Sequence, residues 1–342
     1  MNDPAPATDT DRETARLGWA RAATGDATFE LHRASTDAGF RSYWRGATTE
    51  GSRIVMDSPP DKEDVRPWLR IRDLLERGGV RMPQVMAQDA EAGFLLLEDL
   101  GAQTCLDVLT ADNADALLDA AVAQLLKLQA IPCPDDLPAY DEALLMRELR
   151  LFDQWFLGRH LGVELTGEEM HQLESIYRRL TSAALDQSQV LVHRDYMPRN
   201  LMPLSGPGEP GPAVLDFQDA VRGPVAYDPV SLFKDAFLSW PLERVDVWLD
   251  RYHARAQQAG IPVPALARFR RDAELIGMQR HLKVIGIFAR LWHRDSKPKY
   301  VADVPRFIAY LDEVLPRHPE LAPLQDLIDR HVRPHLHDDS PT

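Results

Sequence analysis

The fold is decided by residues 191–202, which read LVHRDYMPRNLM, and by residues 213–219, which read AVLDFQD. In each stretch a short apolar run of strand character adjoins polar and charged residues. Asp195 is suited to orient a hydroxyl group and accept its proton, while Asn200 and Asp216 offer the hard oxygen atoms that magnesium prefers. The three side chains converge if the two apolar runs lie side by side. The sequence therefore predicts phosphoryl-transfer chemistry.

The spacing within the two stretches matches H-R-D-x-x-x-x-N followed by D-F-x. The alternative is that His193, Arg194 and Asp195 form a surface charge cluster and that Asp216 is a loop acid. The combined spacing disfavours that alternative. On these residues the chain resembles the protein-kinase-like fold in its small-molecule branch, the aminoglycoside phosphotransferase family, with D-F-Q in place of D-F-G.

The resemblance covers most of the chain and implies an α+β fold with two lobes. The N-lobe would be a small antiparallel sheet, and the larger C-lobe would be mainly helical. ATP would be the co-substrate and Mg²⁺ the metal cofactor. The implied catalytic residues are His193, Arg194, Asp195, Asn200 and Asp216, and the implied metal ligands are Asn200 and Asp216.

Residues 214–236 point to a branch within the family. VLDFQDA at 214–220 is followed by GP at 223–224, YD at 227–228 and SLFKDA at 231–236. This run looks like that of the anomeric kinases of N-acetylmuramate and N-acetylglucosamine, which recycle peptidoglycan sugars. The resemblance implies an ATP-dependent kinase acting on the anomeric C1 hydroxyl of these amino sugars. Two alternatives stay open: a kinase of an aminoglycoside or another amine, and a nucleotide-binding pseudokinase.

The composition excludes several classes of protein. The chain has 342 residues, 44% of them hydrophobic, so it can bury a core without disulfides or a structural metal. Cys105 and Cys133 lack metal-ligand spacing, which suits a reducing compartment. Neither a signal peptide nor an apolar run of about 18 residues is evident, so we expect a cytoplasmic protein without a membrane partner. The net charge of −14 repels nucleic acids.

The periodicity of the N-terminal part predicts a small antiparallel sheet with one helix, preceded by a lead-in helix. The expected helices are residues 11–23 and 65–75, and the expected strands are 28–32 and 40–45 as a hairpin, 53–56, 80–86 and 94–97. Beyond Gly101 the apolar spacing is mostly helical. We place the lobe boundary at residues 97–101, with the N-lobe at 1–100 and the C-lobe at 101–342.

The resemblance makes residues 97–100 the hinge, where backbone groups around Glu98 and Leu100 would read the adenine edge. The alternative is a simple acidic turn between the lobes. Asp228 resembles the buried acid with which the family supports its catalytic loop. Asp219 either touches the substrate or caps the following turn.

One position departs from the kinase pattern. Many kinases hold the α- and β-phosphates with a lysine on the third strand, where this chain has Met56. The nearest cations are Arg41 and Arg45, which alternate on the second strand and therefore share one face. Either is a candidate to reach the nucleotide, with a solvated strand face as the alternative. The turn at residues 35–39 lies where a glycine-rich loop would be, but it holds a single glycine.

Residues 275–291 are apolar on nearly all sides, which predicts a buried helix. Gln279, Lys283 and Arg290 nevertheless share one stripe of that helix with Gly286. Buried cations need an anion or hydrogen-bond acceptors, which suits contact with an anion or a sugar. The alternative is that they pair with internal acids or extend to solvent.

A second helix, expected at residues 141–160, places Glu148, Trp155 and Arg159 on one face. An acid beside an indole ring is suited to hold a sugar, and burial against an internal arginine is the equal alternative. The candidate substrate-binding residues are Glu148, Asp219, Gln279, Lys283 and Arg290. The sequence leaves the oligomeric state open.

Overall fold

The computed structural model describes residues 9–34, 40–204 and 211–336. It divides into two compact units: the first contains Met1–Gln124 and Arg199–Gln218, and the second contains Leu125–Pro198 and Asp219–Thr342. The N-lobe predicted at residues 1–100 falls within the first unit, which also includes the segment carrying Asn200 and Asp216. The hinge at residues 97–101 stays a prediction.

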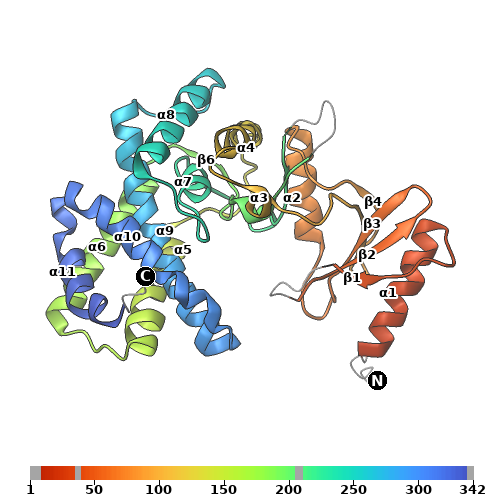
Figure 1. Cartoon of the computed structure of the whole chain (residues 1–342), viewed down its shortest axis with the longest axis horizontal. Helices are drawn as coiled ribbons and strands as arrows, with labels where there is room; N and C mark the ends of the chain where they lie inside the picture. Colours follow the sequence, from red (N-terminus) through yellow and green to blue (C-terminus); the bar gives the residue numbers. More distant parts are fainter. Residues whose placement is uncertain (1–8, 35–39, 205–210, 337–342) are drawn as a thin grey trace. The chain divides into compact units, whose positions relative to one another are not determined.

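The first unit is built on a five-stranded antiparallel sheet (Figure 1). From edge to edge its strands are β1 (His32–Arg33), β2 (Ser42–Thr48), β3 (Gly51–Asp57), β5 (Phe94–Glu98) and β4 (Val85–Asp89). The small antiparallel sheet that the sequence predicts is therefore confirmed.

Three strands begin later than the sequence predicts, among them β2, which starts at Ser42 and not at residue 40. β1 starts at His32 and not at residue 28, because Phe29 is buried in the core beside Gly46. A Cβ atom on Gly46 would lie 2.3 Å from the Phe29 ring, so only glycine permits this packing. β4 starts at Val85 and not at residue 80. Pro83 has no N–H group to donate to a strand ladder.

The lead-in helix is α1 (Asp9–Thr24), which packs on the sheet through a small apolar cluster that includes Ala20 and Val55. Arg12 and Arg16 both bind the buried carboxylate of Asp57, at 2.7 and 2.9 Å. Asp57 therefore anchors α1 to the end of β3. Because side chains alternate along a strand, Met56 faces the opposite side of the sheet.

The helix predicted at residues 65–75 is α2 (Arg66–Arg77), with Pro67 in its first turn. It ends where Gly79 adopts a positive φ of 73°, a conformation that favours glycine. Its buried face carries Trp68, and the Trp68 ring lies 5.0 Å from the ring of Phe217. Two further helices of this region are α3 (Cys105–Val108) and α4 (Ala114–Gln129).

The segment that returns to the first unit forms a short antiparallel pair, β7 (Leu201–Met202) with β8 (Ala213–Val214). The 3₁₀ turn η2 (Pro198–Asn200) precedes β7. The N–H of Val214 donates to the carbonyl of Arg81 at 2.8 Å, which ties the pair to the chain before β4. The two apolar runs of the opening motif thus contribute this pair and the strand before it, β6 (Gln189–Val192).

The second unit is mainly helical, as the sequence predicts. Its two paired strands are β6 and β9 (Val221–Pro224). Its main helices are α5 (Glu142–Leu151), the π-helix η1 (Phe152–His160), α6 (Gly167–Leu185), α7 (Tyr227–Phe233), α8 (Leu242–Gln258), α9 (Leu266–Asp295), α10 (Val304–Val314) and α11 (Ala322–His331). Short 3₁₀ turns η3 (Pro298–Asp303), η4 (Leu315–Arg317), η5 (Pro319–Leu321) and η6 (Arg333–His335) join the last helices.

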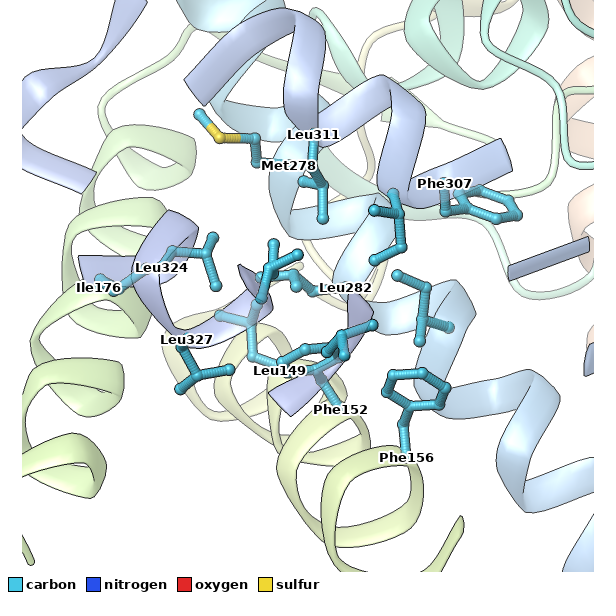
Figure 2. Packing of buried hydrophobic residues seen from close by; sticks show 14 of the residues in the cluster. Leu149, Phe152, Phe156, Ile176, Met278, Leu282, Phe307, Leu311, Leu324 and Leu327 are labelled. Carbon is cyan, nitrogen blue, oxygen red and sulfur yellow. The ribbon is translucent and has the colours of Figure 1, made fainter. Parts of the chain in front are cut away.

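The core of this unit is a large apolar cluster around α9 (Figure 2). Leu282 of α9 lies among side chains from α5, η1, α10 and α11, such as Leu149, Phe152, Leu311 and Leu324. The buried helix predicted at residues 275–291 is therefore confirmed. Within the described residues, no helix has the length and apolar character needed to cross a membrane.

Candidate active site

A buried carboxylate holds the catalytic loop that follows β6. Oδ2 of Asp228 accepts the backbone N–H of His193 at 2.7 Å, and Oδ1 accepts that of Arg194 at 3.1 Å. Asp228 lies at the start of α7 and is fully buried. Burial raises the pKa of Asp228 to about 7, although the two N–H groups oppose this shift. The carboxylate thus fixes the backbone on the N-terminal side of Asp195.

The backbone of the two motifs is unusual. Among the described residues, the non-glycine residues with positive φ are Arg194 (76°), Asp216 (60°) and Ser296 (55°). The first two belong to the predicted catalytic and metal loops. Such conformations cost free energy and gather at functional sites, where they direct a side chain. After Arg194, the N–H of Asp195 donates to Nδ1 of His193 at 3.3 Å.

The side chain of Glu148, only 5% exposed, collects four donors beside the catalytic loop. Its oxygens accept from Nη2 of Arg194 at 2.7 Å, from Nε2 of Gln279 at 3.4 Å and from the hydroxyl of Tyr140, and they lie 3.1 Å from Nζ of Lys283. Glu148 therefore links helix α5 to the catalytic loop and to α9. This is the internal pairing that the sequence left open as an alternative to sugar binding.

Charge balance keeps this cluster ionised. Burial alone would raise the pKa of Glu148, but Lys283 and Arg194 lower it below its ordinary value. Burial alone would lower the pKa of Lys283, but Tyr227, Glu148 and Asp195 raise it. Nζ of Lys283 also donates to the Tyr227 hydroxyl at 3.1 Å. Lys283 is thus a neutralised internal cation within electrostatic range of Asp195.

Arg290 differs from the other residues of the stripe. It is half-buried, its Nε is buried without a hydrogen-bond partner, and within residues 9–34, 40–204 and 211–336 it makes no hydrogen bond or ion pair. Burial, followed by the neighbouring Arg294, lowers the pKa of Arg290. The helix surface at Gly286 has no free space for a ligand. A Cβ atom there would lie 2.3 Å from the carbonyl carbon of Leu151. Arg290 therefore makes no short-range ion pair among the described residues, although Asp295 and Glu148 act on it electrostatically.

The other substrate candidates are dispersed. Asp219 is exposed in the turn before β9. The Arg159 guanidinium lies 5.3 Å from the Trp155 ring on η1, and Trp155 packs against the large core cluster. The structure thus brings Glu148, Gln279 and Lys283 into one cluster with Arg194, without including Asp219.

Asn200 and Asp216 lie together in the first unit. The carbonyl of Asn200 accepts the N–H of Leu215 at 2.9 Å, which continues the register of β7 and β8. Asp216 follows directly, with an exposed side chain whose Oδ1 accepts from Nε2 of Gln218 at 2.9 Å. A carboxylate and an amide oxygen are ligands that suit Mg²⁺, which takes its remaining ligands from phosphates and water. These residues therefore fit the predicted metal.

No group of three or more His, Cys, Asp or Glu side chains capable of holding a metal occurs among the described residues. A magnesium site of the predicted kind does not need one, because the protein supplies only one carboxylate and one amide to it.

Each candidate of the predicted nucleotide region has a protein partner. Arg41 pairs with Glu63, and Arg45 pairs with Asp99. The Glu98 carboxylate pairs with Arg81 at 2.6 Å, and its backbone N–H donates to the carbonyl of Gln84. Leu100 is half-buried. The turn at residues 35–39 lies outside the described residues. The adenine-binding role of the hinge stays a prediction.

Sequence reasoning missed several partners in these clusters. Tyr140, Glu63 and Asp99 follow no motif, and their roles depend on which segments fold together. Tyr227 could have been found, because it directly precedes the motif acid Asp228 and lies on the same short helix.

Three features are typical of a kinase-like phosphotransferase. These are a loop that carries Asp195 and is held by a buried aspartate, the neighbouring segments of Asn200 and Asp216, and a fold of one antiparallel sheet with many helices. Residues 30–271 match the phosphotransferase enzyme family, and the chain belongs to that family. It is 54% identical over 300 residues to a protein from Pseudomonas aeruginosa named N-acetylmuramate/N-acetylglucosamine kinase, and the match covers 87% of this chain and 88% of that relative. The predicted family resemblance is therefore confirmed.

Solved structures agree on the fold. An aminoglycoside phosphotransferase solved with ADP gives a TM-score of 0.57 at 18% identity, covering 89% of this chain and 98% of that one. A choline kinase from Streptococcus pneumoniae gives 0.62 at 13% identity, covering 88% and 99%. This likeness confirms the predicted protein-kinase-like α+β fold.

Proposed function

We propose that this chain is an ATP-dependent sugar kinase that transfers the γ-phosphoryl group to the anomeric C1 hydroxyl of N-acetylmuramate and N-acetylglucosamine. The observation that carries the proposal is the Glu148 cluster. It joins the catalytic loop to the helices α5 and α9, which bear the candidate sugar ligands. The names of the 54% identical relatives support the choice of sugar. The role in cell-wall sugar recycling and the cytoplasmic location belong to the same proposal.

In the proposed reaction, Asp195 accepts the proton of the C1 hydroxyl while the hydroxyl oxygen forms a bond to the γ-phosphorus. The bond from that phosphorus to the β,γ-bridging oxygen breaks, and ADP carries away the electron pair. His193 and Arg194 hold the loop through Asp228 and Glu148. Asn200 and Asp216 would hold Mg²⁺, whose charge neutralises the phosphates when it is bound.

Arg290 is the best candidate to recognise the acid that distinguishes N-acetylmuramate. The lactyl carboxylate of this sugar would supply the anion that the half-buried guanidinium lacks. Lys283 is a weaker candidate because Glu148 already neutralises it. Glu148, Gln279 and Asp219 remain proposed sugar contacts, although a bond from Glu148 to the sugar would have to replace one of its present donors.

An acceptor panel tests the proposal. Mg²⁺-dependent ADP release is measured with N-acetylmuramate, N-acetylglucosamine, choline and an aminoglycoside, each with the wild type and with Asp216→Asn. We expect turnover on the two amino sugars and its loss in the variant, because the neutralised side chain no longer balances the metal's charge. Turnover on the aminoglycoside or choline alone would favour an amine kinase. No turnover on any acceptor by a chain that binds ADP would favour a pseudokinase.

A further inference from the structure

The position at which many kinases carry a phosphate-holding lysine is apolar here. Met56 of β3 is fully buried and faces away from α1. Its partner across the strand pair is Tyr43 of β2. Arg45 of β2 and Arg41, one residue before β2, alternate with Tyr43, so two cations lie near the position of the missing lysine.

Arg45 already binds the residues that follow β5. Its Nε and Nη2 donate to the Asp99 carboxylate at 2.6 and 2.9 Å, and Nη2 also donates to the carbonyl of Gly101 at 2.7 Å. The same carboxylate accepts the N–H of Gly101 at 2.9 Å. Arg45 therefore fixes residues 99–101, and moving it to a phosphate would break this set of bonds.

Arg41 retains free donors. Its Nη2 bonds the Glu63 carboxylate, just before α2, and its side chain is 12% exposed. Its Nε is buried and has no hydrogen-bond partner among the described residues. A guanidinium has five N–H donors, so the bond to Glu63 uses only part of its capacity. The planar guanidinium group of arginine is well suited to bind a phosphate group through two N–H donors.

Tyr43 connects Arg41 to the predicted metal loop. Arg41 and Asp216 both lie close enough to the Tyr43 phenol to act on it electrostatically. Arg41, Tyr43, Glu63 and Asp216 all belong to the first unit. Arg41, which is paired with Glu63, and the proposed metal ligand Asp216 thus act on the same phenol. The charged phosphates of a nucleotide would be bound beside that ligand.

We propose that the Arg41–Glu63 ion pair replaces the missing lysine: Arg41 contacts the nucleotide's terminal phosphates, and Glu63 positions Arg41. This inference rests on the phosphotransferase chemistry of the family and not on the identity of the acceptor. Nucleotide binding tests it without any sugar, so its failure is distinguishable from a wrong choice of acceptor.

Titration calorimetry of the full chain with MgADP and with adenosine provides the test. Arg41→Met should weaken MgADP binding about 10- to 150-fold, the range expected for one charge-assisted contact, and leave adenosine binding within about 2-fold. Arg72→Met is the matched control, since Arg72 also pairs with a glutamate, has a buried unbonded Nε and is 13% exposed in the same unit. It should bind both ligands normally.

Two conservative variants keep the test decisive if Arg41→Met folds poorly. Arg41→Lys keeps the charge and should retain more MgADP affinity than Arg41→Met. Glu63→Gln should raise the KM for ATP, with a smaller effect on kcat, because Arg41 remains but is less well positioned. Unchanged MgADP binding in Arg41→Met, or an equal loss for MgADP and adenosine, would overturn the proposal. So would a larger MgADP-selective loss in Arg45→Ala than in Arg41→Met.

Discussion

The backbone N–H of His193 donates to Oδ2 of Asp228 at 2.7 Å, across 35 residues of sequence. The other oxygen of the same carboxylate accepts the N–H of Arg194. A single buried acid therefore fixes two successive peptide groups immediately before Asp195, the proposed catalytic residue. The geometry of the loop therefore depends on a residue that lies far from it in the sequence.

Replacing Asp228 should change how stability depends on pH. Burial raises the pKa of Asp228 to about 7, above its value of about 3.9 in the unfolded chain. The stability contributed by this group is full below pH 4 and is lost as the pH rises through 7. The free energy of unfolding of Asp228→Asn, relative to wild type, should therefore increase by about 2–3 kcal/mol from pH 5 to pH 8. Denaturant titrations at both pH values provide the measurement, and a constant difference would contradict the assignment.

Binding and chemistry should separate in Asp195→Asn. This variant should keep MgADP affinity within about 3-fold, because Asp195 acts on the acceptor hydroxyl, while kcat falls about 10²- to 10⁴-fold. Calorimetry and steady-state kinetics on the same preparation provide the two values. Wild-type turnover in this variant would remove Asp195 from the mechanism.

Close packing between α9 and α5 predicts different outcomes for two glycines of one helix. A Cβ atom at Gly286 would lie 2.3 Å from the Leu151 carbonyl carbon, whereas at Gly277 the nearest atom, on the Val230 side chain, is 3.4 Å away. Gly286→Ala should cost about 1–3 kcal/mol of stability through overpacking. Gly277→Ala should change stability by less than about 1 kcal/mol, since it gains helix propensity. Equal effects in chemical denaturation would contradict the packing.

The two cations of the α9 stripe should behave differently. Arg290→Met should reduce kcat/KM for N-acetylmuramate about 10- to 150-fold and for N-acetylglucosamine less than about 3-fold, because only the first sugar carries a carboxylate. Arg294→Met, one turn further on, removes an arginine that is paired with Asp295 and serves as the control. Kinetics on both sugars decide the matter, and equal losses would mean that Arg290 does not read the carboxylate.

Lys283→Met should instead affect both sugars alike. It leaves the buried Glu148 with one cation fewer and should cost about 3–5 kcal/mol of stability. A loss confined to N-acetylmuramate, in a folded variant, would show that Lys283 and not Arg290 meets the acid.

The sequence predicted that the segments of Asn200 and Asp216 lie side by side, because this pairing depends on short apolar runs that the sequence shows. Asn200 and Asp216 meet through a two-residue strand pair whose apolar runs are visible in the sequence. Helical periodicity likewise placed Gln279 and Lys283 on one stripe, and the structure joins both to Glu148. Periodicity is a property of a single helix or strand, so tertiary contacts do not change which of its residues share a face.

The partners of these residues could not be predicted, because such pairs depend on contacts between different segments. Glu63, Asp99 and Tyr140 lie in different segments from the residues they bind, and no repeat or motif marks them. The late start of β1 had the same origin, since the alternation that begins at residue 28 fits a strand equally well until Phe29 packs against Gly46. Tertiary contacts decided each of these cases.

The position of the phosphate on the product tests the central claim most directly. The chain is incubated with ATP, Mg²⁺ and N-acetylglucosamine or N-acetylmuramate, and the product is examined by ³¹P and ¹³C NMR for coupling between the phosphorus and the sugar carbons. The account predicts coupling to C1 and C2 and the loss of the reducing-end signals, which means phosphorylation of the anomeric hydroxyl. Coupling to C6 with a free reducing end would contradict the proposed function while leaving the fold and the family unaffected.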